Sequence, residues 1–272
     1  MLQVSQVERR AAQMTETETF LRCEHKYPMN RSLMKEFLEE AEVHLVPDQY
    51  PEYELHSIYY DTEDSGMIIH CLDHPMYKEK LRLRSYGEPK EGQPVYLELK
   101  KKFKDTGQKR RIALEESEAY AYLNQGVVPH LSSGTQIYSE IDYLVRRKKI
   151  VPKMFIAYHR IAFCGKEEAD LRITFDSAIR FRSSHISLHE SGREQYLTSP
   201  EEILMEVKLS GRYPYWLSDL LSKMKLFRSS FSKYGTFYTM QEQKQISDQV
   251  ATVPESISLN QESEESICSL PY

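Results

Sequence analysis

Long basic side chains recur at alternate positions in several short segments of this 272-residue sequence. In YKEKLRLRSY, Lys80, Arg82 and Arg84 share one parity, whereas Leu81 and Leu83 share the other. Side chains two positions apart lie on the same face of a β-strand, so the pattern predicts a strand with one basic face. Guanidinium and ammonium groups bind phosphate oxygens, and phosphate binding is therefore the chemistry that this face could perform.

Five further segments concentrate charge on one parity in the same way. Their charged members are Arg22, Glu24, Lys26, Glu98, Lys100, Lys102, Arg160, Arg172, Asp176, Glu206 and Lys208. For a single strand, a solvent-exposed face is the simpler interpretation. Six strands favour the alternative, because like charges on neighbouring strands repel and need a compensating anion. With this face inward, a closed sheet would form a basic channel for a chain of phosphates, with glutamates to hold a divalent cation.

The distribution of charge along the chain is uneven, although the formal net charge is only −5. Residues 78–111 contain twelve Lys or Arg against five Asp or Glu, a local charge of +7, which leaves −12 for the rest. Residues 241–272 are rich in Gln, Ser and Glu and bury little apolar surface, so we predict a disordered acidic tail. We assign 1–15 to an N-terminal helix or flexible segment and 16–240 to one folded domain.

Period-2 patterns and apolar stripes predict the elements of this domain. Strands are expected at 19–27, 54–61, 77–86, 94–102, 109–114, 153–163, 171–175, 178–182 and 203–209. Helices are expected at 32–45, 115–125, 135–148 and 215–227, with Asn30 capping the first and Gly126 ending the second. Many strands with helices inserted between them predict an α+β fold built on a barrel or a strongly curved antiparallel sheet.

Several classes of protein are disfavoured by what the sequence lacks. It has neither a GxxxxGK[ST] nor a GxGxxG motif, which argues against a P-loop or Rossmann nucleotide site, and no nucleic-acid partner is expected. Its four cysteines are far apart, so neither a zinc site nor a disulfide framework is indicated. No apolar run approaches the length of a spanning helix, and we expect a cytoplasmic protein.

The ordered set RCEHKY, SIYYDT, KLRLRSYG, YLELKKK, YHRIAF, LRITFD, LMEVKLSG and SFSKYG resembles the catalytic domain of the vacuolar transporter chaperone (VTC) family. This family belongs to the CYTH-like triphosphate tunnel metalloenzymes. The resemblance covers about residues 19–238. It implies a closed antiparallel eight-stranded β-barrel, the triphosphate tunnel, with helices packed outside. The implied activity is ATP-dependent extension of inorganic polyphosphate with Mn²⁺ (or Mg²⁺).

The resemblance also assigns roles to residues. The phosphate-gripping residues with a catalytic role would be Lys26, Arg82, Arg84, Arg160, Arg172 and Lys208. Substrate contacts would come from Lys100, Tyr158, Ser232 and Lys233, and metal ligands from Glu206, Glu98 and Glu24. His25 replaces the second Glu of the ExExK signature of the hydrolase branch, which favours the polymerase branch. Either Arg110 or Arg111 should point inward, and the sequence leaves open which.

Two other functions remain open at this point. One is a tunnel hydrolase of tripolyphosphate or an organic triphosphate, or a cyclase of the same fold, which predicts more tunnel carboxylates. The other is a non-catalytic polyphosphate-binding module. The family often works beside a membrane subunit, so a separate membrane partner and a peripheral position at the inner face of the membrane are also implied.

Overall fold

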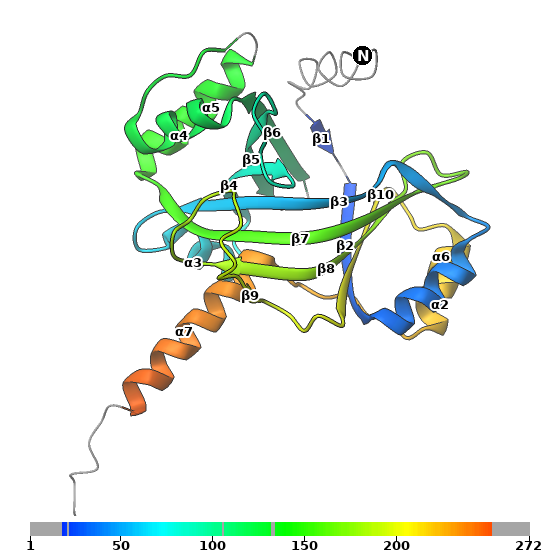
Figure 1. Cartoon of the computed structure of the whole chain (residues 1–272). Helices are drawn as coiled ribbons and strands as arrows, with labels where there is room; N and C mark the ends of the chain where they lie inside the picture. The colour runs from blue at the N-terminus through cyan, green and yellow to red at the C-terminus, as the bar shows by residue number, and fades with distance from the viewer. Residues whose placement is uncertain (1–17, 21, 105, 132–133, 252–272) are drawn as a thin grey trace, which may run out of the picture. The chain divides into compact units, whose positions relative to one another are not determined.

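The computed structural model describes residues 18–20, 22–104, 106–131 and 134–251, which form ten strands and six helices (Figure 1). The strands are β1 (Glu18–Phe20), β2 (Arg22–Asn30), β3 (Leu45–Asp61), β4 (Tyr77–Tyr86), β5 (Val95–Phe103), β6 (Thr106–Leu114), β7 (Val151–Gly165), β8 (Arg172–Arg182), β9 (Gln195–Tyr196) and β10 (Glu202–Ser210). The helices are α2 (Arg31–Ala41), α3 (Gly66–Leu72), α4 (Glu116–Gln125), α5 (Thr135–Lys148), α6 (Tyr215–Lys223) and α7 (Lys233–Ala251). The α+β class is confirmed.

All ten strands belong to one antiparallel sheet. Its order is β1-β6-β5-β4-β3-β7-β8-β10-β2, and the short β9 pairs with β8. Each strand pairs with its neighbour in antiparallel register, and β3 and β7 are the longest partners. The order brings strands from the start, middle and end of the chain into one surface.

The sheet is strongly curled. Glu24 of β2 and Lys100 of β5 are six strands apart in the hydrogen-bonded order, which in a flat sheet would separate them by about 29 Å. Their side chains nevertheless form an ion pair, with Lys100 Nζ 3.3 Å from Glu24 Oε2. The face that carries both residues is therefore concave, and we call it the inner face.

The prediction of a closed eight-stranded barrel is not confirmed. Among the described residues no hydrogen bonds join the two edge strands, β1 and β2, and the sheet has ten strands. These edge strands are consecutive in the chain, with only position 21 between them. The chain itself therefore keeps Phe20 and Arg22 within about 7 Å of each other, so the two edges meet through the backbone without a ladder.

The outer face of the sheet is apolar and carries two hydrophobic clusters. In the first, α4 and α5 pack on β4, β5 and β6 through residues such as Leu83, Leu97 and Ile141. In the second, α2 and α6 lie side by side and cover β2, β8 and β10 (Figure 1). Leu81 and Leu83 lie in the first cluster, as the alternation of 77–86 predicts, which leaves the charged parity on the inner face.

Several predicted element bounds agree closely with the structure. Strand β4 and helix α5 occupy the predicted 77–86 and 135–148. The Asn30 side chain caps α2 by accepting from Leu33 N at 2.8 Å, and Gly126 ends α4 with a φ of 72°. The strands predicted at 171–175 and 178–182 are one strand, because Ala178 adopts a φ of 49° at a bulge rather than breaking the pairing.

Two helices were not predicted. Helix α3 follows Asp61, a buried residue whose carboxylate accepts from Met67 N at 2.8 Å and from Ile68 N at 2.9 Å. The Asp61 carboxylate thereby caps the first turn of this short helix. None of the helices in the described part of the chain combines the length and apolarity needed to span a membrane.

Helix α7 reaches into the segment 241–272, for which the sequence predicts disorder. It continues to Ala251, since its Met, Gln, Glu and Lys residues are good helix formers and no Gly or Pro interrupts 241–251. Residues 252–272 and the predicted N-terminal segment 1–15 lie outside the described residues. The chain divides into two compact units, one up to Phe237 and one from Tyr238 on.

Candidate functional site

The charged side chains of the inner face are largely buried. Glu98 is 2% exposed and Glu206 5%, values that exclude a solvent-exposed face. Other buried charged residues of this face are Arg84, Arg111, Arg160, Asp176 and Lys233. Buried charges are retained in folded proteins when they are paired, so the partners of each carboxylate define the site.

The first group, here called the Glu98 cluster, comprises Glu98 with Arg82, Arg84, Lys109 and Arg111. Arg82 and Arg111 are the register partners of Glu98 on β4 and β6, and each donates from Nε to its carboxylate at 2.7 Å. Lys109 Nζ lies 2.9 Å from Oε1 and Arg84 NH1 3.8 Å from Oε2. Burial raises the pKa of Glu98, but the four cations outweigh it and hold the pKa well below its usual range.

The second group, here called the Glu206 cluster, is built on β2, β7, β8, β10 and the start of α7. Arg160 NH2 donates to Glu206 Oε2 at 3.1 Å, and Lys208 Nζ lies 3.5 Å from the same oxygen. Lys26 Nζ and Lys233 Nζ each lie 3.7 Å from Oε1. Burial is again outweighed by the surrounding cations, so the pKa of Glu206 is also held well below its usual range.

Asp176 completes the Glu206 cluster. Arg160 binds it in a fork, with Nε 2.5 Å from Oδ1 and NH2 2.7 Å from Oδ2, and Lys233 Nζ lies 2.5 Å from Oδ2. Arg160 and Lys233 also lie over the ring of Tyr158, at 5.3 and 4.3 Å from its centroid. Arg160 thereby fixes the positions of Asp176 and Glu206 relative to each other.

Positive charge exceeds negative charge at these clusters. Nine basic side chains lie within 4.0 Å of only four carboxylates, those of Glu24, Glu98, Asp176 and Glu206. The nine are Lys26, Arg82, Arg84, Lys100, Lys109, Arg111, Arg160, Lys208 and Lys233, which leaves a net formal charge of about +5. A further lysine, the half-buried Lys80, donates to Ser232 Oγ at 3.0 Å. A concave surface with this excess attracts polyanions.

The match to a sequence family decides the affiliation of this fold. The profile of the VTC domain covers residues 21–240. The chain belongs to the VTC domain family. The resemblance stated from the motifs is thereby confirmed over most of the chain. No functionally curated protein matches the sequence.

Solved structures with a similar arrangement are distant from this VTC domain. A candidate adenylate cyclase from Bacillus halodurans is 12% identical, with a TM-score of 0.49, and the match covers 79% of this chain and 95% of that one. A candidate adenylyl cyclase from Hippeastrum, described as having a dominant triphosphatase activity, is 13% identical with a TM-score of 0.48 over 79% and 94%. At these values neither structure bears on the substrate of this chain.

The VTC domain brings most of the predicted phosphate-binding residues together. Lys26, Arg160, Lys208 and Lys233 meet in the Glu206 cluster, and Arg82 and Arg84 in the Glu98 cluster. The Tyr158 hydroxyl connects the two groups by accepting from Arg84 NH2 at 3.2 Å. The predicted position of these side chains on one inward face is therefore observed.

One predicted residue, Arg172, makes its contacts outside these clusters. Arg172 donates to Asp48 at 2.8 Å and to the Tyr53 hydroxyl at 3.1 Å, so its guanidinium is held by strand β3. Lys100 contacts Glu24, whose pKa is lowered to about 2 because Lys100 and other lysines outweigh the effect of burial. Glu24, Glu98 and Glu206 do not offer three ligand atoms to one metal ion; of the described residues, only Glu54, His56 and Glu190 do.

Three members of the site had no role assigned from the sequence. The parity of β8 places Asp176 on the charged face, but neither the pattern nor the resemblance gave it a function. Lys109 and Arg111 share one parity, and the structure resolves the open choice: Arg111 binds Glu98, whereas Arg110 NH2 lies 3.2 Å from Glu140 of α5 on the outer face. A signal was available, because Ile112 and Leu114 share the parity of Arg110, and apolar residues mark the outer face of the other strands.

Proposed function

We propose that this protein is an ATP-dependent, divalent-metal-dependent polyphosphate polymerase that transfers the γ-phosphoryl group of ATP to a growing polyphosphate chain. The observation that carries the proposal is the excess of nine basic side chains over four carboxylates on a concave surface. Membership of the VTC domain family supports it. No feature of the described residues supports the membrane subunit that the resemblance implies.

The accessible members of the site are suited to bind the substrate. The side chains of Lys26, Arg82 and Lys208 are 21%, 24% and 26% exposed, and that of Lys100 is 52% exposed. Incoming phosphates would contact these four cations first. The more deeply buried Arg160 would hold the carboxylates in place, because its guanidinium is already bound to Asp176 and Glu206.

The proposed reaction is a direct transfer. A terminal oxygen of the polyphosphate chain attacks the γ-phosphorus of ATP in line. The bond between the γ-phosphorus and the β,γ-bridging oxygen breaks, and ADP leaves with that oxygen and its electron pair. Arg82, Lys26 and Lys208 would stabilise the negative charge on the transferring group, so that catalysis is positional and electrostatic.

Glu206 is the best candidate to hold the metal. Carboxylate oxygens are the ligands that Mn²⁺ and Mg²⁺ prefer, and Glu206 shares Arg160 with Asp176 and Lys26 with Glu24. The surrounding lysines and arginines disfavour a metal ion alone, and phosphates that enter with it would supply the missing negative charge. The bound metal would neutralise phosphate oxygens during transfer.

A hydrolase of tripolyphosphate or an organic triphosphate is the second candidate. Asp176 favours it, because this buried residue adds an inner carboxylate to those of Glu24, Glu98 and Glu206, and a hydrolase predicts more tunnel carboxylates. In that reaction water, in place of the chain terminus, would attack the terminal phosphorus.

Product analysis separates the candidates. Purified protein is incubated with ATP and Mn²⁺, and the products are resolved on a gel and assayed for ADP and orthophosphate. Long chains together with ADP are expected for the polymerase. Orthophosphate without chains would favour the hydrolase, and binding of polyphosphate without turnover would leave a binding module.

The double variant Arg82→Ala, Arg84→Ala is expected to bind tripolyphosphate at least tenfold more weakly, since each charged hydrogen bond contributes about 1.5–3 kcal/mol. Calorimetric titration without nucleotide measures the change. The matched control is Arg110→Ala, which removes a guanidinium that contacts Glu140 on the outer face. Equal affinity of the double variant and the control would place the two inner arginines outside the binding surface.

The affinity for tripolyphosphate is also expected to fall as the pH rises above about 8. Burial lowers the pKa of Lys109 to about 8, with Arg111 adding to the effect and Glu98 opposing it. A bound phosphate favours the protonated amine, so binding takes up a proton above this pKa and weakens by up to about tenfold per pH unit.

Titrations between about pH 7 and pH 9 without metal measure this slope. Lys109→Arg keeps its charge throughout and is expected to flatten the slope. Tyr59 has its pKa lowered to about 8, as Arg82 and Arg84 outweigh burial, and its ionisation acts in the same direction. Tyr59→Phe isolates that contribution. A slope that survives in both variants would rule out these two groups.

A further inference from the structure

A buried histidine on the outer face of the sheet has one nitrogen without a hydrogen-bond partner. His56 of β3 is 1% exposed, and its Nδ1 lies 2.7 Å from the Leu188 carbonyl oxygen. A carbonyl can only accept, so Nδ1 carries the proton and donates it. The other nitrogen, Nε2, is buried and makes no hydrogen bond within the described residues. An unsatisfied buried nitrogen is costly unless something binds it.

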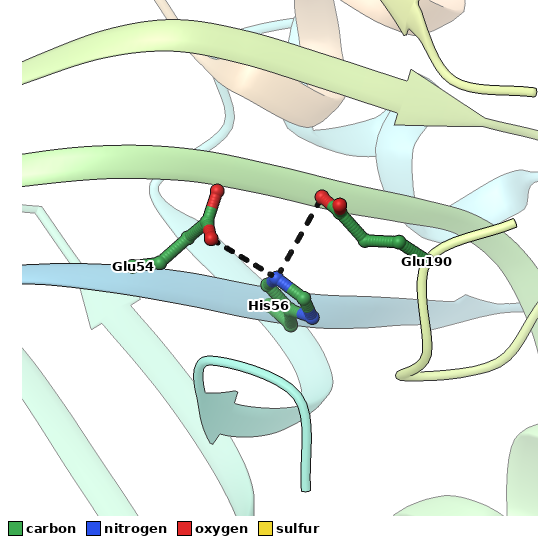
Figure 2. Close-up of side chains that lie close together, drawn as sticks. All are labelled: Glu54, His56 and Glu190. Carbon is green, nitrogen blue, oxygen red and sulfur yellow. Dashed lines mark ion pairs between the residues drawn. The ribbon is translucent and has the colours of Figure 1, made fainter. Parts of the chain in front are cut away.

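Two carboxylates face this nitrogen. Glu54 Oε2 lies 3.9 Å and Glu190 Oε1 3.8 Å from His56 Nε2, and Figure 2 shows both side chains directed at the ring. Glu54 precedes His56 by two positions on β3, and Glu190 comes from the segment 183–194 between β8 and β9. Both separations are too long for a hydrogen bond, so an imidazolium would not satisfy Nε2 here.

The two carboxylates are held side by side by a third group. Arg180 of β8 donates from NH2 to Glu54 Oε1, and to Glu190 Oε1 at 2.5 Å. One guanidinium balances only one of the two negative charges. With a neutral imidazole the group therefore keeps a formal charge of −1 on a partly exposed surface, which attracts a cation.

The geometry is close to that of a metal site. In tetrahedral coordination with bonds of 2.0–2.2 Å, ligand atoms are about 3.4 Å apart, so a shift of about half an ångström would bring either carboxylate oxygen to that distance from His56 Nε2. The hydrogen bond from Nδ1 to a carbonyl is the usual support of a metal-binding imidazole, because it fixes the tautomer and the ring. An imidazole nitrogen with two carboxylates suits Zn²⁺ and similar divalent ions, whereas Mg²⁺ and Ca²⁺ prefer oxygen ligands alone.

We propose that Glu54, His56 and Glu190 bind a divalent transition-metal ion, with Zn²⁺ as the best match, and that this ion fastens the segment 183–194 to strand β3. The site is distinct from the inner clusters: His56 packs edge-on against Phe155 of the outer hydrophobic cluster, whereas its neighbour Ser57 accepts from Arg84 on the inner face. The side chains of Glu54 and Glu190 are 37% and 36% exposed, which leaves room for water at the remaining coordination positions.

Titration of the full chain with Zn²⁺ alone tests the proposal. The wild type is expected to bind one ion that is lost, or weakened at least tenfold, in both Glu54→Gln and Glu190→Gln. The matched control is Glu52→Gln, which removes a carboxylate from the same strand, 2.9 Å from His159 Nε2, where the structure offers no third ligand. This control should retain the wild-type affinity for Zn²⁺.

The absorption spectrum of bound Co²⁺ and the rate of proteolysis provide two further tests of this metal site. Co²⁺ bound to the wild type should show visible absorption bands of a nitrogen- and oxygen-ligated site, and Glu190→Gln should lose them. Zn²⁺ should also slow proteolysis within 183–194 in the wild type but not in Glu54→Gln. Equal Zn²⁺ affinity in the wild type and the double Gln variant would overturn the proposal, as would the absence of Zn²⁺ binding by a wild type that is folded.

Discussion

Glu98→Gln is expected to lower the free energy of unfolding by about 3–5 kcal/mol in the absence of phosphate. Removing one partner from a buried charge network lowers the free energy of unfolding by about this much, because the remaining charges stay buried without that partner. Here the substitution leaves Arg82, Arg84, Lys109 and Arg111 around a neutral amide. Urea unfolding of wild type and variant in phosphate-free buffer measures the loss.

Tripolyphosphate should reverse part of this loss. A phosphate group in the Glu98 cluster would replace the missing negative charge, so the ligand is expected to raise the melting temperature of Glu98→Gln more than that of the wild type. Glu140→Gln is the control, since Glu140 pairs with Lys101 and Arg110 on the outer face, at a side-chain exposure of 25%. The free energy of unfolding of Glu140→Gln should change by only about 0–1 kcal/mol. Tripolyphosphate should raise the melting temperature of this control by the same amount as that of the wild type. Equal ligand-induced shifts in all three proteins would contradict phosphate binding at Glu98.

Glu206→Gln is expected to reduce turnover with ATP and Mn²⁺ by on the order of 10²–10³-fold or more, equivalent to several kcal/mol of transition-state stabilisation. Glutamine keeps the shape of the side chain but is a much poorer metal ligand. Four cations, Arg160, Lys208, Lys26 and Lys233, would be left with less compensation. Binding of tripolyphosphate without metal should therefore be retained or strengthened.

Initial rates of ADP formation measure the effect of Glu206→Gln on turnover. Metal-free titrations measure its effect on the binding of tripolyphosphate. Glu202→Gln provides a control on the same strand, because its carboxylate accepts from Ser199 N at 2.7 Å at the exposed start of β10. Undiminished turnover in Glu206→Gln would remove this residue from the metal site. Loss of both turnover and phosphate binding would assign it a structural role.

The strand alternation predicted the inner face because parity is a local property of the chain. Parity alone predicts that Lys26, Arg82, Arg160 and Lys208 share one face of the sheet. Which residues meet across the interior depends on register and curvature, which are long-range. Arg82, Glu98 and Arg111 align only through the pairing of three strands, and Glu24 reaches Lys100 only because the sheet curls.

The failures of prediction have the same origin. The sequence could not show that Asp176 would share Arg160 with Glu206, since these residues come from three different strands. Nor could it place His56 under a loop more than a hundred positions away. The metal ligands assigned by resemblance are divided between two clusters, each dominated by cations, and this division reflects the fold rather than the residue types.

The pairing of β2 with β10 has a consequence for how the protein is made. Strand β2 pairs with β10, so Asn30 and Glu202 become partners although about 170 positions separate them in the chain. A chain emerging from the ribosome therefore exposes Lys26 long before β10 has been synthesised. Lys26 therefore meets Glu206, and the basic interior takes shape, only after β10 has been synthesised.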